Sequence, residues 1–296
     1  MIIALTGATG FLGGHVLRRA REAGHEVRAL VRKPQPPCEG VEWIAGSLGD
    51  AASLATLCEG TDAIIHVAGV VNGDAATFDR ANRLGTVGML AAATGKRFVH
   101  VSSLAAREPQ LSNYGASKRA AEDAVVASAL DWRIVRPPAI YGPGDTDNLQ
   151  LFRLAKWGIV PLPPKGRMSV IHADDMARLV VALVESAEPH SFYEGDDGLP
   201  GGWSHADFAR AIGSAVGRKV ATIPLPRPLV RAGAALDGLL RRGNAKLTPD
   251  RAAYFCHPDW VIEPVRRPPA DLWTPQIATA AGLAATAAWY REAGWL

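Results

Sequence analysis

Strand-like and helix-like segments alternate along the first 140 residues of this chain. An apolar run at residues 2–6 ends in glycines, and residues 12–23 then place apolar side chains at helical spacing until Gly24. The same patterns predict strands at residues 26–31, 63–67, 98–102 and 133–136, and helices at residues 51–59, 78–94 and 112–128. Such alternation is typical of an α/β fold, in which helices cover both faces of a parallel sheet.

The pattern changes after Tyr141. A glycine-rich turn and a proline-rich stretch come first, followed by a predicted strand at residues 169–172 and a predicted helix at residues 174–185. From residue 194 onward the many prolines are expected to permit only short helices and loops. We therefore predict a first domain at 1–188 and a smaller lobe at 189–296, with 143–166 assigned to either.

The composition excludes several classes of protein. A hydrophobic content of 48% and a net charge of +3 are typical of a globular protein, and no basic tract with interleaved aromatic residues indicates nucleic-acid binding. No apolar run approaches the roughly 18 residues that span a bilayer, so no membrane partner is expected. The first residues lack a signal-peptide pattern, and Cys38, Cys58 and Cys256 lack metal-binding spacing. We expect reduced thiols, a cytoplasmic location and no metal.

A glycine-rich turn joins the first predicted strand to the first predicted helix. Gly7, Gly10 and Gly13 follow each other at three-residue intervals. Their positions fit a tight turn, a close approach of the backbone to a pyrophosphate and close packing of the helix on the strand. The N terminus of the helix would favour the phosphate charge. The turn predicts dinucleotide binding in a Rossmann-type doubly wound parallel sheet, although glycines needed only for packing would look the same.

The end of the second predicted strand indicates which dinucleotide is bound. An acidic residue there usually binds the ribose of NAD, but Val31 occupies that position, and Arg32 and Lys33 follow it. Basic side chains can bind the 2′-phosphate of NADP. We therefore predict NADP, with NAD as the alternative if Arg32 and Lys33 belong to a solvated loop.

Tyr114 and Lys118 are four residues apart in a predicted helix, so their side chains share one face. A free tyrosine has a pKa of about 10, roughly three units too high for acid/base work at neutral pH, which corresponds to about 4 kcal/mol. An ammonium group about 4 Å away at an effective dielectric constant of about 20 supplies a similar energy. Ser103, at the end of a predicted strand, could bind a substrate oxygen. The alternative is a surface Tyr–Lys pair.

Several further motifs occur in a fixed order, and together they resemble the extended short-chain dehydrogenase/reductase family, also called the NAD-dependent epimerase/dehydratase family. The resemblance covers roughly residues 1–185. The motifs are TGATGFLGG (6–14), DAIIHVAG (62–69), NRLGT (82–86), VSS (101–103), YGASK (114–118), RPPAIYGPGD (136–145) and VIHADD (170–175).

The resemblance implies roles for individual residues. Ser103, Tyr114 and Lys118 match the catalytic triad, and Asn82 matches an asparagine beside the active site. The cofactor-binding positions implied by the resemblance and by the turn are Gly7, Gly10, Phe11, Leu12, Arg32, Lys33, Leu48, Ala68, Gly69, Tyr114, Lys118 and Pro137. The first domain is then expected to bind the dinucleotide and the second lobe the substrate. The family also implies a homodimer.

Three functions remain open on the sequence alone. We favour an NADP-dependent oxidoreductase that reduces a ketone or aldehyde, or oxidises the matching alcohol, with Tyr114 as acid/base. A nucleotide-sugar epimerase or dehydratase is the second, but Ala139 and Met168 stand where such enzymes carry phosphate or sugar contacts. A non-catalytic dinucleotide-binding subunit is the third. We interpret His66 as a packed histidine, and Asp174 and Asp175 as partners of a helix N terminus.

Overall fold

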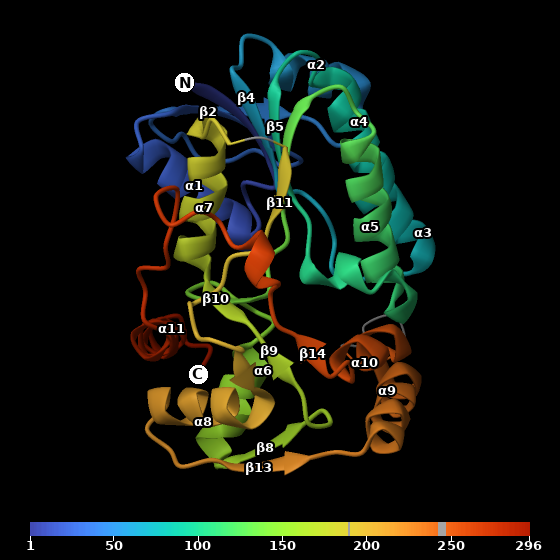
Figure 1. Ribbon diagram of the computed structural model, residues 1–296, viewed down its shortest axis with the longest axis vertical. Helices are drawn as coiled ribbons and strands as arrows, with labels where there is room; N and C mark the ends of the chain where they lie inside the picture. Colours follow the sequence, from blue (N-terminus) through green and yellow to red (C-terminus); the bar gives the residue numbers. More distant parts are fainter. Residues whose placement is uncertain (189, 242–246) are drawn as a thin grey trace. The chain divides into compact units, whose positions relative to one another are not determined.

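The computed structural model describes residues 1–188, 190–241 and 247–296 (Figure 1). The chain divides into two compact units. The first unit comprises residues 1–137, 174–195 and 264–274, and the second comprises residues 138–173, 196–263 and 275–296. The division is therefore discontinuous in sequence and differs from the single predicted boundary at 188/189, where residue 189 lies outside the described residues. Residues 143–166 fall in the second unit.

The first unit is built on a parallel sheet that contains seven strands among the described residues. Its strand order is β3-β2-β1-β4-β5-β6-β11, so the winding reverses between β1 and β4, the point at which such sheets bind ligands. The strands are β1 (Ile2–Thr6), β2 (Glu26–Val31), β3 (Val41–Ala45), β4 (Ala63–His66), β5 (Arg97–Val101), β6 (Asp131–Val135) and β11 (Ser191–Tyr193). The predicted Rossmann-type fold is confirmed. The prediction missed β3 and β11, which are the two edge strands.

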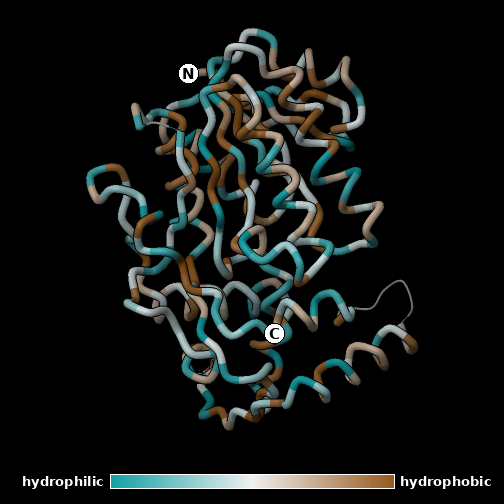
Figure 2. The backbone as a smooth tube through the Cα atoms, turned by 45° about the vertical axis from the view of Figure 1, so that its right-hand side comes forward, coloured by the Kyte–Doolittle hydropathy of each residue, from teal (hydrophilic) through white to brown (hydrophobic). Residues whose placement is uncertain are grey.

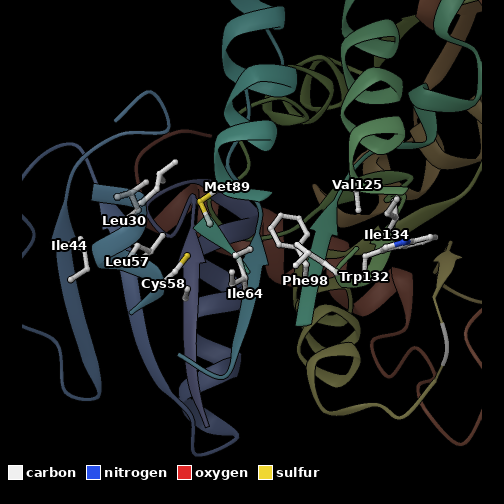
Figure 3. Close-up of a cluster of buried hydrophobic side chains, with 14 residues drawn as sticks. Leu30, Ile44, Leu57, Cys58, Ile64, Met89, Phe98, Val125, Trp132 and Ile134 are labelled. Atoms are coloured by element: carbon white, nitrogen blue, oxygen red, sulfur yellow. The ribbon is translucent and has the colours of Figure 1, made fainter. Parts of the chain in front are cut away.

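Helices cover both faces of this sheet (Figure 1). On one face, apolar side chains of α2 (Ala51–Cys58), α4 (Gly85–Ala92) and α5 (Asn113–Val126) pack against the strands. Figure 3 shows part of this core, including Leu57, Met89 and Val125 beside Ile64 and Phe98. The other face carries α1 (Phe11–Glu22) and α7 (Ala173–Glu185). These helices match the predicted ones to within two residues at most ends.

The helix predicted at residues 78–94 is irregular. It consists of a short α3 (Ala75–Phe78), a π-helical segment at residues 79–84 and α4. Segments of π-helix inside α-helices occur frequently at functional sites. Here the segment contains Asn82, which is 2% exposed.

The second unit combines short strand pairs with helices around a core of its own. In it, β7 (Ala139–Tyr141) pairs with β10 (Val170–His172), β8 (Ile159–Leu162) pairs with β13 (Ala221–Pro224), and β9 (Arg167–Met168) pairs with β12 (Trp203–Ser204) and β14 (Asp259–Trp260). Its helices are α6 (Leu149–Trp157), α8 (His205–Ala215), α9 (Arg227–Arg241), α10 (Pro249–Phe255) and α11 (Thr279–Glu292). Across the described ranges of the chain, no helix has both the length and the apolar character needed to cross a bilayer.

The expectation that prolines permit only short helices after residue 194 was wrong. The helices α9 and α11 contain 15 and 14 residues. Pro228 is the second residue of α9, where a missing backbone N–H removes no helical hydrogen bond. Pro275 precedes α11 in a loop. These prolines lie at the start of a helix or outside the helices, so they do not interrupt α9 or α11.

Candidate active site

The junction between β1 and α1 leaves no room for a side chain at Gly7 or Gly13. Gly7 has a φ of +80°, and a Cβ atom there would lie 2.8 Å from the backbone nitrogen of Ala68. A Cβ atom on Gly13 would lie only 1.9 Å from the carbonyl oxygen of Gly7. No described side chain caps α1 at Gly10, so the N-terminal N–H groups of the helix remain available to an anion. The turn therefore fits a dinucleotide pyrophosphate, with Phe11 and Leu12 opening α1.

Replacing Gly13 with alanine is expected to weaken dinucleotide binding. The added methyl group would push α1 away from the turn, and overpacking of this kind costs about 1–3 kcal/mol. Where that cost opposes the dinucleotide-bound geometry, the affinity falls by about 5- to 150-fold. Gly14→Ala is a matched control, because a Cβ atom there would meet Ala8 at an ordinary 3.7 Å. Titration of both variants with dinucleotide tests this prediction. Equal affinities in the two variants would contradict it.

Arg32 and Lys33 follow β2 directly and are both exposed. Neither side chain forms an ion pair with any residue that the structure describes, whereas Arg28 in the same strand pairs with Glu42. Val31, at the position where an acid would bind the ribose of NAD, is buried. The end of β2 thus presents two cations without a carboxylate partner in the described chain, which suits a phosphate ligand.

Tyr114 and Lys118 lie one turn apart on α5, as predicted. The helix begins after Ser112, whose hydroxyl accepts a hydrogen bond from the N–H of Gly115 at 2.9 Å. Lys118 is 5% exposed, and its Nζ donates to the carbonyl oxygen of Val101 at 2.9 Å. Burial lowers the pKa of Lys118 to about 8, against the opposing effect of the Glu122 carboxylate. Tyr114 is half-buried, with its ring 5.8 Å from that of Phe78.

Ser103 and Pro137 lie beside each other beyond the ends of β5 and β6. Ser103 is 9% exposed, and its Oγ accepts a hydrogen bond from the N–H of Ala105 at 3.2 Å. The carbonyl oxygen of Pro137 accepts from the N–H of Leu104 at 3.0 Å, which holds these two segments together. The neighbouring Ser102 hydroxyl is buried and has no hydrogen-bond partner among the described residues. Lys118 reaches the same end of β5 through Val101.

Asn82 connects the loop after β4 to α5. Its side-chain oxygen accepts from the N–H of Val70 at 2.8 Å, and its amide donates to Ser117 Oγ at 2.9 Å. A Cβ atom on Gly69 would lie 2.9 Å from Asn82 Oδ1 and 3.5 Å from Lys118 Nζ. The structure therefore brings Gly69, Asn82 and Lys118 together.

The other predicted residues contact different parts of the first unit. Ala68 contacts the glycine turn, since its N–H donates to Thr6 Oγ1 at 3.2 Å. Leu48 packs over Gly85 in α4, and its role at a cofactor remains a prediction. Asp174 and Asp175 lie in the first turn of α7, where Asp174 pairs with His15, Arg18 and Arg19 of α1.

Comparison with known proteins identifies the family of this chain. A family model described as NAD(P)H-binding matches residues 7–187. The chain belongs to that family. It is an extended short-chain dehydrogenase/reductase and an NAD(P)-dependent oxidoreductase.

Relatives of this extended short-chain dehydrogenase/reductase are similar over almost their full length. The ceramide reductase of Caulobacter vibrioides is 40% identical, covering 100% of this chain and 96% of its own length. The 2-alkyl-3-oxoalkanoate reductase of Stenotrophomonas maltophilia is 28% identical, with coverage of 96% and 97%. A crystal structure of the human epimerase family protein SDR39U1 with NADPH shares the fold, with a TM-score of 0.75, 21% identity and coverage of 97% and 99%.

One feature of this dehydrogenase/reductase was missed from sequence, a hydrogen-bonded chain through His66. Thr86 Oγ1 donates to the carbonyl oxygen of Asn82 at 2.6 Å, so it accepts from His66 Nε2 at 3.0 Å. His66 Nδ1 then accepts from Thr6 Oγ1 at 2.7 Å. Burial, with a smaller effect of the Lys118 charge, lowers the pKa of His66 to about 3 and keeps the ring neutral. His66 is thus a packed histidine that also joins the glycine turn to Asn82.

Proposed function

We propose that this chain is an NADP-dependent reductase that converts a 3-oxo group on a long-chain lipid to the secondary alcohol. The observation that carries the proposal is the buried ammonium of Lys118, one helical turn after Tyr114 and hydrogen-bonded to the end of β5. This arrangement supplies the proton that a carbonyl needs when it accepts a hydride.

We assign a separate role in the reaction to each of these residues. NADPH, when bound, supplies the hydride to the carbonyl carbon. The phenol of Tyr114 donates its proton to the carbonyl oxygen and later recovers a proton from water. The positive charge of Lys118 stabilises the phenolate that is left behind. Ser103 donates a hydrogen bond to the same substrate oxygen, and Asn82 holds the loop that carries Gly69 against Lys118.

The substrate class rests on the two reductases that match nearly the whole chain. One is named for ceramide and the other for 2-alkyl-3-oxoalkanoates. Ceramides carry a hydroxyl group at C3 next to an amide-bearing carbon, and the second substrate carries a ketone at C3 next to an alkylated carbon. An oxygen at C3 beside a substituted carbon is the common element, and a reductase would act on the 3-oxo form of such a compound.

The direct test is to follow NADPH absorbance with purified protein and a panel of ketones. We expect oxidation of NADPH with a 3-oxo ceramide or a 2-alkyl-3-oxo acid, and formation of the matching alcohol. A nucleotide sugar should give no turnover. The proposal fails if none of the ketones is reduced, or if a sugar nucleotide is isomerised without net change in the dinucleotide.

The choice of NADP over NAD can be tested at the end of β2. Arg32→Gln together with Lys33→Gln is expected to raise the KM for NADPH by about 100-fold, because each of the two charge-assisted contacts to the 2′-phosphate is worth about 1.5 kcal/mol or more. The KM for NADH should change little, since NADH lacks this phosphate. Initial-rate measurements with NADPH and with NADH give the two KM values for this comparison. A parallel rise in both KM values would show that the cations do not select NADP.

A further inference from the structure

The second unit carries an exposed apolar face on the strand pair β8 and β13, which lie side by side (Figure 1). Ile159 pairs with Ala221, and Pro161 pairs with Ile223. Since alternate residues of a strand point to the same side, these four side chains share one face. All four are exposed, with Ile159 at 53% and Ile223 at 48%. We call this surface the β8–β13 face.

An exposed tryptophan precedes this face in the chain, at the start of β8. Trp157, the last residue of α6, is 85% exposed. Only Gly158 separates it from β8, and Gly158 accepts a backbone hydrogen bond from Ala221 at 2.9 Å. A tryptophan in this position covers no core and enlarges an apolar surface that a protein in water alone would not need. Exposed apolar side chains grouped on one pair of strands in this way favour an interaction site.

Positive charges predominate in the segments that form the face, although Asp207 lies in the neighbouring α8 and Asp237 in α9. Residues 148–172, which contain α6, β8, β9 and β10, include four Lys or Arg and no Asp or Glu. Residues 216–236, which contain β13 and most of α9, also include four Lys or Arg and no Asp or Glu. Lys156, Arg218 and Lys219 are exposed next to Trp157 and β13 in the chain. The face is therefore apolar at its centre and mainly basic at its edge.

Helix α9 adds further apolar surface directly after β13. Leu229, Leu236 and Leu239 are 57%, 56% and 75% exposed and lie within one stripe of the helix, at spacings of seven and three residues. Val230 and Ala234, on the other side, pack against α10. Figure 2 shows the resulting alternation of hydrophobic and hydrophilic residues along α9.

We propose that the β8–β13 face binds the surface of membranes that contain anionic phospholipids. Tryptophan partitions to the membrane–water interface, where its ring lies among the headgroups. Lys and Arg side chains extend from such a face toward the phosphates, and each contributes about 1 kcal/mol near an anionic surface. A second copy of this chain is a poorer occupant, because a symmetric contact would bring the same cations against each other. The inference departs from the sequence-based expectation of no membrane partner, which rested on the lack of a membrane-spanning segment. It goes beyond the proposed reaction and does not depend on its substrate.

The experiment measures binding of the full chain to vesicles by flotation. One set of vesicles is phosphatidylcholine alone, and the other is phosphatidylcholine mixed with phosphatidylglycerol. We expect binding to the mixed vesicles that weakens with salt. Trp157→Ala should weaken it about tenfold or more, and Arg218→Gln with Lys219→Gln about 30-fold, the equivalent of about 2 kcal/mol.

Val265→Ser provides the matched control, because Val265 is 87% exposed in the first unit, away from the β8–β13 face in sequence. Its vesicle binding should equal that of the parent. Thermal unfolding of each variant shows whether it is folded, so a loss of binding is not confused with a loss of structure. The proposal is overturned if the parent does not bind mixed vesicles, or if the Trp157 and Arg218/Lys219 variants bind as the parent does. It is also overturned if Trp157→Ala converts a dimer to a monomer in light scattering without changing vesicle binding.

Discussion

Replacing Tyr114 with phenylalanine should lower kcat for ketone reduction by about 10³-fold and leave dinucleotide affinity nearly unchanged. A general acid positioned in the transition state typically contributes about 10²- to 10⁴-fold. The phenol hydroxyl is the only group removed, and the ring keeps its contact with Phe78. Stopped-flow or steady-state measurement of NADPH oxidation, combined with a binding titration, checks both parts of the expectation.

Tyr193→Phe is the control for this variant. Tyr193 lies on β11 in the same unit and is 4% exposed, so the substitution removes a phenol hydroxyl from another part of the fold. It should leave kcat within a few-fold of the parent. If Tyr114→Phe retained most of its activity, another group would have to supply the proton. If Tyr114→Phe lost dinucleotide binding in parallel with turnover, Tyr114 would be a binding residue and the proposed acid/base role would be wrong.

Local patterns were sufficient to predict the elements that build the site. The strand at residues 2–6, the helix carrying Tyr114 and Lys118, and the glycine turn each depend on spacing within a short segment. The structure shows all three. The edge strands β3 and β11 were missed because neither has a local pattern that distinguishes it. β11 is only three residues long, and β3 has just one buried residue, Ile44.

Contacts between distant segments could not be predicted in this way. The chain from Thr6 through His66 to Thr86 joins three segments that meet only in the folded sheet. A buried histidine in a strand gave no sign of its two hydroxyl partners. The π-helical segment around Asn82 could not be predicted from the sequence either, because its apolar spacing fits an ordinary helix. The division into units was missed for the same reason, since residues 264–274 join the first unit only through tertiary packing.

One turn beyond Lys118, α5 carries a further charged residue on the face that holds Tyr114 and Lys118. Glu122 follows Lys118 by one turn and is 1% exposed. Its two carboxylate oxygens accept hydrogen bonds from Arg136 Nε at 2.9 Å and Nη2 at 2.7 Å. Arg136 is 5% exposed, so this bidentate pair is almost wholly removed from water. The spacing of Tyr114, Lys118 and Glu122 is visible in the sequence, but the partnership with Arg136 is not.

Glu122→Gln should therefore destabilise the protein by about 3–5 kcal/mol, because it leaves the guanidinium of Arg136 buried without its main counter-charge. Glu194, 3.6 Å from Arg136 Nη1, would compensate in part and place the loss toward the lower end of that range. Asp123→Asn is the matched control. Asp123 is the next residue of α5 and forms an exposed pair with Arg119, whose loss should cost about 0.5 kcal/mol or less. Denaturant unfolding of both variants gives the comparison.

The same substitution should move the pH profile of the reaction. The Glu122 carboxylate raises the pKa of Lys118, while burial lowers it to about 8. Glu122→Gln removes the raising effect, so the pKa of Lys118 falls further. Because only the protonated Lys118 stabilises the Tyr114 phenolate, kcat/KM should decline as the pH rises through the pKa of Lys118, and the decline should begin at a lower pH in the variant. Asp123→Asn should leave the pH of this decline in kcat/KM unchanged. A profile that stays in place in Glu122→Gln, despite the expected loss of stability, would show that the charge of Lys118 does not control the acid at Tyr114.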